Sequence, residues 1–150
     1  MAIRKILFAT DFSKASERAK QLAAGMKNQL GCKLDVVHVY DPTALAMPVP
    51  YGVLPGVEQW IDTHFDAFQA KGRQALDDLC PELGPGCSGA FVEGKPGPAV
   101  VAYAAAHDID LIIMGTHGHS GLERLMVGSV AAYVVHHASC PVLTVKGDAA

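Results

Sequence analysis

The chain has 150 residues, of which 50% are hydrophobic and 18% are charged, and its formal net charge is -3. This length is typical of one compact domain, so we expect a single domain over residues 1–150. The apolar fraction excludes an intrinsically disordered protein. Because the 12 basic residues form no run, the charge pattern argues against a nucleic-acid partner and against attraction to an anionic membrane.

Two further features concern the compartment in which the protein works. No apolar stretch approaches the roughly 20 residues that a membrane helix needs, and the first residues lack the pattern of a secretory signal. The cysteines form no Cys-x-x-Cys pair, which indicates neither a zinc knuckle nor a redox dithiol and favours reduced thiols. They are Cys32, Cys80, Cys87 and Cys140. Together these features predict a cytoplasmic protein.

Short apolar runs that favour strands alternate with longer stretches of helical periodicity. The predicted strands cover residues 4–9, 34–40, 89–93, 111–114 and 141–145, and the predicted helices cover 15–30, 61–79, 99–107 and 130–138. Ser13 is predicted to cap the first helix and Gly31 to end it. Pro81 is expected to stop the second helix, and Pro98 to lie in the first turn of the third.

This alternation predicts an α/β fold: one five-stranded parallel sheet in the order 3-2-1-4-5, with helices on both faces. The uninterrupted apolar run at 111–114 is typical of a strand that is buried on both faces. In such sheets, ligands bind at the carboxyl ends of the strands, where the strand order reverses. Here that point lies between the first and fourth strands, so we expect Ala9, Thr10 and Asp11 to face residues 114–118.

Four of the 15 glycines fall between Gly115 and Gly128. Gly115 and Gly118 are expected to adopt left-handed backbone conformations and to let a ligand approach closely. Gly128 and Ser129 stand where a helix is predicted to begin, so unpaired amides and the helix dipole are available to phosphate oxygens. Magnesium is expected to supply further neutralisation. The alternative is a flexible loop in which Ser129 is only an N-cap.

Two familiar phosphate motifs do not fit. The spacing of Gly115, Gly118 and Gly121 is not Gly-x-Gly-x-x-Gly, and the following helix begins too late, which argues against a dinucleotide-binding Rossmann site. Residues 89–95 match the first seven positions of the Walker A pattern, but Pro96 replaces the hydroxyl residue that binds magnesium. Because the start of this match is itself predicted to be a strand, we do not interpret it as a P-loop.

The glycine pattern resembles the ATP-binding branch of the universal stress protein family: Gly, two residues, Gly, nine residues, Gly, then Ser or Thr. It is matched here without a gap by Gly115, Gly118, Gly128 and Ser129. The resemblance covers the whole chain and includes residues 9–13, 38–40 and 140–145. It implies an adenine nucleotide α-hydrolase-like fold and a stress-response regulatory protein that binds ATP with magnesium. It also implies a homodimer through the last strand.

The resemblance assigns roles to individual positions. Asp11 would bind ribose hydroxyls or approach the metal, and the Val39 backbone would recognise adenine. Met114 and Gly115 would line the nucleoside. The phosphates would be held near His117, by Gly118, Gly128, Ser129 and Val130. Ala9, next to Thr10, stands where relatives often carry proline, a departure with little expected effect on binding.

Other interpretations of the same residues stay open. Asp11 could instead help Ser13 to cap the first helix. His117 and His119 could act as general acid or base in a slow ATPase or an autophosphorylating protein, or could lie exposed beside phosphate. Two histidines alone fall short of a zinc site. A dimerising scaffold that never binds nucleotide is a further alternative.

The remaining candidates have structural interpretations. His38 is expected to be a hydrogen-bonded core residue, and His136 and His137 to favour the end of the last helix. The proline-rich stretch 41–55 is apolar for a loop. We expect it to form a flap packed on the next helix, with a partner surface as the alternative.

Overall fold

The computed structural model describes residues 1–45, 57–117 and 127–147, without the side chains of residues 44, 45 and 57–61. The strands are β1 (Lys5–Ala9), β2 (Lys33–Tyr40), β3 (Cys87–Glu93), β4 (Leu111–Gly115) and β5 (Val142–Val145). The α-helices are α1 (Glu17–Leu30), α2 (Val57–Glu82), α3 (Pro96–Ala106) and α4 (Ser129–His137). Short 3-10 helices cover Lys14–Ser16 and Pro42–Leu45.

The strands form one parallel sheet in the order β3-β2-β1-β4-β5, which confirms the predicted topology. Ala9 is level with Val37 of β2 on one side and with Met114 of β4 on the other. The carboxyl end of β1 therefore lies between two strands whose chains leave in opposite directions across the sheet. This is the switch point at which ligands bind in open α/β sheets.

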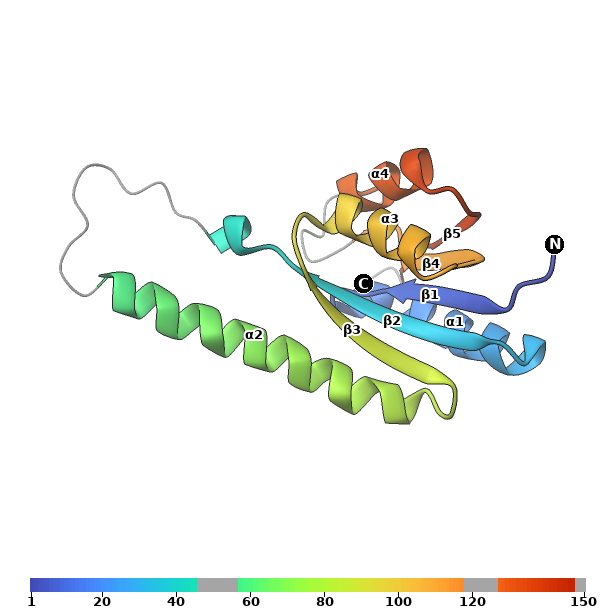
Figure 1. Cartoon of the computed structure of the whole chain (residues 1–150), viewed down its shortest axis with the longest axis horizontal. Helices are drawn as coiled ribbons and strands as arrows, with labels where there is room; N and C mark the ends of the chain where they lie inside the picture. Colours follow the sequence, from blue (N-terminus) through green and yellow to red (C-terminus); the bar gives the residue numbers. More distant parts are fainter. Residues whose placement is uncertain (46–56, 118–126, 148–150) are drawn as a thin grey trace.

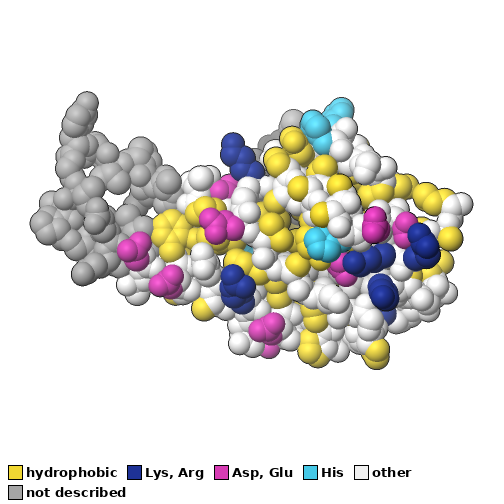
Figure 2. All heavy atoms as spheres, in the orientation of Figure 1, with side chains coloured by type: hydrophobic (Ala, Val, Ile, Leu, Met, Phe, Trp, Pro, Cys, Tyr) yellow, Lys and Arg dark blue, Asp and Glu magenta, His cyan; other side chains and the backbone are white. Residues whose placement is uncertain are grey.

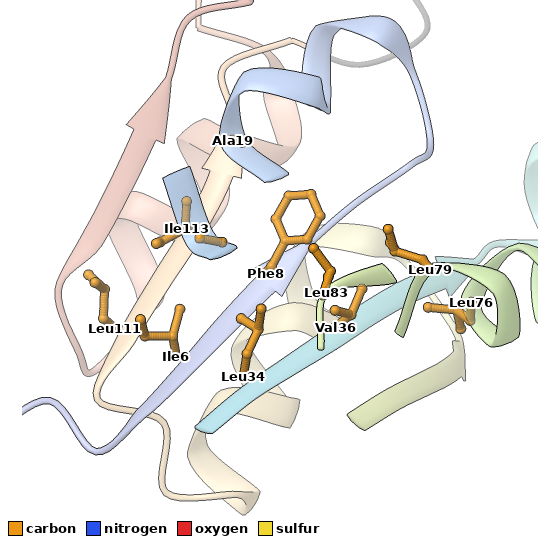
Figure 3. Close-up of a cluster of buried hydrophobic side chains, with 11 residues drawn as sticks. Ile6, Phe8, Ala19, Leu34, Val36, Leu76, Leu79, Leu83, Leu111 and Ile113 are labelled. Carbon is orange, nitrogen blue, oxygen red and sulfur yellow. The ribbon is translucent and has the colours of Figure 1, made fainter. Parts of the chain in front are cut away.

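Successive residues of the central strands point to opposite faces of the sheet and build two hydrophobic layers. Ile6 and Phe8 pack with side chains of α1 and α2 on one face (Figure 3), and Leu7 packs with side chains of α3 and α4 on the other. Figure 1 shows α3 and α4 together on one side of the sheet, and α2 running along β3 and extending beyond it. Helices cover both faces, as predicted.

Several predicted boundaries differ from the structure, including the following three. Helix α2 continues through Pro81 to Glu82, because the Leu83 N–H still donates to the Leu79 carbonyl and both leucines are buried. Helix α3 begins at Pro96, where a missing N–H costs nothing because the first helical amides have no partner. Strand β3 begins at Cys87 rather than at residue 89.

Ser13 does not cap a helix through its side chain. A 3-10 turn stands between Ser13 and α1, the Ser13 side chain makes no capping hydrogen bond, and its Oγ is buried without a partner among the described residues. Gly31 does end α1, in the predicted left-handed conformation with φ 62°. Residues 89–93, the start of the Walker A match, lie in β3 and cannot cradle phosphate.

The described surface carries both signs of charge. Figure 2 shows Lys and Arg interspersed with Asp and Glu on the visible face. In the described part of the chain, no helix is both long enough and apolar enough to cross a membrane. The predicted flap, residues 41–55, lies for the most part outside the described residues.

Candidate functional site

A pocket of about 270 Å³ lies at the carboxyl ends of β1, β2 and β4, beside the N-terminal ends of α3 and α4. Three connections of the chain meet there: the turn after β1, the start of α3, and the segment between β4 and α4. Its lining comprises Ala9, Thr10, Asp11, Ser16, Val37, Val39, Pro96, Val100, Met114, Gly115, Thr116, His117, Gly128, Ser129, Val130 and Ala131. The pocket is thus placed at the switch point of the sheet.

The wall between β4 and α4 is polar and is fixed by backbone hydrogen bonds. The Thr116 N–H donates to the Val145 carbonyl of β5 (3.0 Å), and the Gly128 N–H donates to the Thr116 carbonyl (2.7 Å). These bonds hold the start of α4 against the end of β4. Ser129 is the first residue of α4, so the first amides of this helix have no partner within it and line the pocket.

Gly128 is required at this contact because of space. A Cβ on Gly128 would stand 3.0 Å from the Thr116 carbonyl oxygen, which is backbone and has little room to move. Its φ of -60° is ordinary for any residue. The structure makes Gly128, not Ser129, the N-cap of α4, so the capping role given to Ser129 in the flexible-loop alternative is wrong.

Gly115 does not adopt the predicted left-handed conformation. It is the last residue of β4, pairs with Val145 of β5 and is absent from the glycines with positive φ in the described chain. A strand residue in a parallel ladder needs extended backbone, which explains the difference. A Cβ at this position would lie 3.4 Å from the Ala15 carbonyl oxygen, which is an ordinary contact, so space does not require glycine here.

His117 brings an unpaired nitrogen to the pocket. Its Nδ1 lies 2.9 Å from Thr116 Oγ1, whereas its Nε2 is buried without a hydrogen-bond partner among the described residues. Leaving a buried polar nitrogen without a partner is unfavourable by roughly 1–3 kcal/mol. A ligand oxygen would supply the missing partner, so this part of the pocket fits an oxygen-rich group.

The turn after β1 is held by its own hydroxyl groups. Ser16 Oγ donates to the Ser13 carbonyl (2.8 Å) and lies 3.2 Å from Thr10 Oγ1. Thr10 Oγ1 accepts from the Phe12 N–H (3.0 Å), and Asp11 Oδ1 accepts from the Ser13 N–H (3.0 Å). Phe12 has φ 61°, a conformation that is uncommon for a bulky residue. The network therefore fixes Asp11 at the pocket.

The opposite wall, from β2 and α3, is apolar. It consists of Val37, Val39, Pro96 and Val100, with Met114 of β4 beside them. The Val37 carbonyl accepts from the Thr10 N–H (3.0 Å), so the backbone of Val37 faces β1. Val39, two residues further, presents its backbone to the same side, beyond Ala9, where the pairing of β1 with β2 ends. This wall can contact a flat apolar group by its side chains and an edge of that group by the backbone.

The structure brings together every predicted binding residue that it describes. Gly118 and His119 lie outside the described residues, so their predicted roles are not addressed. Five lining residues escaped the sequence reasoning: Ser16, Val37, Pro96, Val100 and Ala131. Strand periodicity points to Val37, because residues 37 and 39 share one face, but the approach of α3 to the pocket has no local signal.

The other histidines have structural roles. His38 Nδ1 donates to the Thr10 carbonyl (2.9 Å), because a carbonyl can only accept, and this agrees with the prediction. His136 and His137 lie in the last turn of α4, as predicted, and His137 stacks on Tyr133 with ring centroids 3.9 Å apart. Within the described ranges, no cluster of three or more His, Cys, Asp or Glu could hold a metal by protein ligands alone.

Comparisons with known proteins agree with this architecture. The profile of the universal stress protein family matches residues 2–146. Universal stress protein A homolog 1 of Coxiella burnetii is 34% identical over 146 residues, covering 97% of this chain and 97% of that protein. Universal stress protein MJ0531 of Methanocaldococcus jannaschii is 32% identical over 146 residues, covering 95% and 82%.

Solved structures share the fold. The hypothetical protein MJ0577 of Methanocaldococcus jannaschii superposes with a TM-score of 0.83 at 25% identity and full coverage of both chains. A universal stress protein in complex with cAMP gives 0.66 at 24% identity, covering 99% of this chain and 100% of that one. The Archaeoglobus fulgidus protein in complex with dAMP gives 0.63 at 22% identity, covering 97% and 100%. With its sheet order and its family profile in agreement, the chain belongs to the universal stress protein family.

Proposed function

We propose that this chain is a cytoplasmic ATP-binding regulatory protein that binds ATP in the pocket at the switch point. The observation that carries the proposal is the start of α4, held against β4 by the 2.7 Å bond from the Gly128 N–H to the Thr116 carbonyl. It presents unpaired amides and the positive end of the helix dipole to the pocket. Phosphate oxygens are the acceptors that such a helix start prefers.

The two walls of the pocket match the two ends of a nucleotide. Adenine would lie against Val37 and Val100, with its edge on the Val39 backbone, and Asp11 would accept from ribose hydroxyls. The triphosphate would extend to the first amides of α4 and to Nε2 of His117, which has no hydrogen-bond partner among the described residues. Two family structures carry cAMP and dAMP, so adenine nucleotides fit this fold.

Magnesium would accompany the phosphates rather than occupy a site of its own. Mg²⁺ is usually held by one or two carboxylates together with substrate phosphates and water. Asp11 is the lining residue with a carboxylate, and one carboxylate beside bound phosphates is sufficient for this mode. The ion would neutralise phosphate charge, which the lining cannot do because it contains no Lys or Arg in the described residues.

We further propose a homodimer through the edge of the sheet at β5. Among the described strands, β5 pairs only with β4, so its outer edge can offer backbone groups to a second copy. Apolar side chains on β5, on α4 and before α4 are exposed: Val127, Tyr133, Val135 and Leu143. Static light scattering on a size-exclusion column tests this. Leu143→Lys should convert a dimer to a monomer, and an unchanged mass would contradict it.

Isothermal titration of the full chain with ATP and magnesium tests the nucleotide proposal. We expect saturable binding at one site per chain, weaker binding of GTP, and unchanged binding in the control variant Gly25→Ala. Gly25 is exposed in α1, and a Cβ there meets nothing within 4 Å. Absence of ATP binding at millimolar nucleotide would overturn the proposal.

The fate of bound ATP separates a binding protein from an enzyme. We expect protein purified under mild conditions to carry an adenine nucleotide, identified by mass spectrometry after denaturation. A regulatory protein should keep added ATP intact over hours. Release of phosphate that is lost in His117→Asn would instead favour the slow ATPase.

A further inference from the structure

A second group of reactive side chains lies away from the pocket, between the end of α2 and the start of β3. Cys80 is near the carboxyl end of α2, Cys87 begins β3, and both thiols are free. The Cys80 side chain is near enough to the Cys87 thiol to help raise its pKa, and both cysteines pack against the same hydrophobic layer. The chain fold thus pairs two cysteines that have no Cys-x-x-Cys spacing.

The position of the Cys80 sulfur is supported by a second contact. A Cβ placed on Gly89 would stand 3.0 Å from Cys80 Sγ, so this sulfur packs directly over the backbone of β3. Residues 87 and 89 lie on the same face of the strand. The Cys80 sulfur therefore sits over the face of β3 that carries Cys87, and Gly89 leaves the space for it.

A surface groove gives access to one of the two thiols. The groove has a volume of about 390 Å³ and is lined by Cys80 but not by Cys87, together with Arg73, Leu76, Asp77, Pro81, Gly89 and Phe91. A small solute that enters the groove meets Cys80 first. Cys87 packs against the core side chains of this face and does not line the groove.

The environment keeps Cys87 protonated. Burial, followed by the nearby Cys80 side chain, raises the pKa of the Cys87 thiol to about 12. A thiol in this state is a poor nucleophile toward external oxidants. The geometry therefore distinguishes an accessible first thiol from a shielded second one.

Closure to a disulfide requires only a local movement. Sulfur atoms in a disulfide are about 2.05 Å apart, so the Cys80 and Cys87 sulfurs must approach one another for the bond to form. Pro81, next to Cys80, has no N–H to donate to the carbonyl of Asp77, so the last turn of α2 has one fewer internal bond. This turn can adjust without loss of a regular helix bond.

We propose that Cys80 and Cys87 are a redox-responsive pair that a hydroperoxide closes to an intrachain disulfide. The Cys80 sulfur attacks one oxygen of hydrogen peroxide, the O–O bond breaks, and the thiol proton leaves with the other oxygen as water. The Cys87 sulfur then attacks the Cys80 sulfenic acid, the S–O bond breaks, and the hydroxyl leaves with the Cys87 proton as a second water. The two thiols lose two electrons and the peroxide gains them. A dithiol reductant reverses the closure by exchange.

The test uses the folded full chain treated with hydrogen peroxide, followed by alkylation of the remaining thiols and denaturation. Cleavage after glutamate separates the two cysteines, because Glu82 stands between them and no other Glu does. We expect the fragments on either side of Glu82 to stay linked until reductant is added. Circular dichroism before denaturation verifies that oxidation occurred in the folded protein.

Variants assign the order of the two steps. Cys80→Ser should lose the link and leave Cys87 reduced, whereas Cys87→Ser should lose the link and accumulate a sulfenic acid on Cys80 that dimedone traps. Cys32→Ser is the matched control, a partly buried cysteine outside the pair, and should keep the full link. Wild-type protein that oxidises at Cys32 or Cys140 while residues 80 and 87 stay unlinked would overturn the proposal, whatever the folding of the variants.

Discussion

Two hollows of the described chain differ in how the chain builds them. The pocket at the switch point is lined from β1, β2, α3, β4 and α4, and its polar wall is backbone. The groove beside β3 is lined from α2 and β3 alone, and its reactive group is the Cys80 side chain. Each depends on one glycine: Gly128 stands against a carbonyl oxygen of the pocket wall, and Gly89 stands under the Cys80 sulfur.

The comparison teaches that similar close contacts have different consequences. A Cβ at Gly128 or at Gly89 would meet its neighbour at the same distance, 3.0 Å. At Gly128 the neighbour is the Thr116 carbonyl, which is fixed by its place in the sheet. At Gly89 the neighbour is the end of a side chain, which can rotate away. We therefore expect a substitution at Gly128 to displace backbone and a substitution at Gly89 to shift only the Cys80 thiol.

Gly128→Ala should have the largest effect. The new methyl group pushes α4 away from β4 and displaces the amides that would hold phosphate, at a cost of about 1–3 kcal/mol. We expect ATP affinity to fall roughly 10- to 100-fold, measured by isothermal titration. The Cys80–Cys87 link should form as in the wild type. Wild-type ATP affinity in Gly128→Ala would show that the contact with Thr116 does not shape the binding site.

The sequence predicted the pocket better than the groove because its signal is local. Gly128 and Ser129 follow a buried strand and begin a helix, and these features are visible in adjacent residues. The pairing of Cys80 with Cys87 depends on how α2 packs on β3, and no spacing rule describes it. The entry of Val100 into the pocket has the same origin, because it follows from the packing of α3 over the sheet.

The same distinction explains the wrong predictions. Gly115 was expected to be left-handed from its residue type, but pairing with β5 holds it extended. Ser13 was expected to cap a helix, but a 3-10 turn intervenes and the capping geometry is lost. In both cases tertiary or local hydrogen bonding outweighs the residue's own preference. The parallel sheet was predictable because strands that alternate with helices are joined by right-handed crossover connections.

Ser129→Ala should have a smaller effect in the same pocket. The variant removes a hydroxyl donor and keeps the backbone amide, so only part of the polar wall is lost. We expect a loss of about 1 kcal/mol, or roughly fivefold in ATP affinity, by isothermal titration. Ser139→Ala, at the exposed far end of α4, is the matched control and should bind as wild type. Equal affinities for all three proteins would assign phosphate binding to amides alone.

Gly89→Ala should change the groove and leave the pocket unchanged. The methyl group would displace Cys80 Sγ from its place over β3, so closure of the disulfide should slow while ATP affinity stays at the wild-type value. The free energy of unfolding should change by less than about 1 kcal/mol, because a side-chain end can move. The linked fraction after a fixed exposure to peroxide measures the effect. Faster closure in Gly89→Ala would show that Cys80 Sγ does not need its place over β3 to reach Cys87.

The smallest effect concerns the stability of the reduced protein at alkaline pH. Because the pKa of Cys87 is raised from 9.0 to about 12 by burial and by Cys80, the unfolded chain loses this proton at lower pH than the folded protein does. Stability from this thiol is therefore complete below pH 9.0 and falls as the pH rises from 9.0 toward about 12. Burial also raises the pKa of Tyr103, so the comparison of wild type with Cys87→Ser in urea unfolding isolates the thiol. The wild type should lose stability more steeply in that window. Parallel curves would mean that the folded protein does not raise the pKa of Cys87.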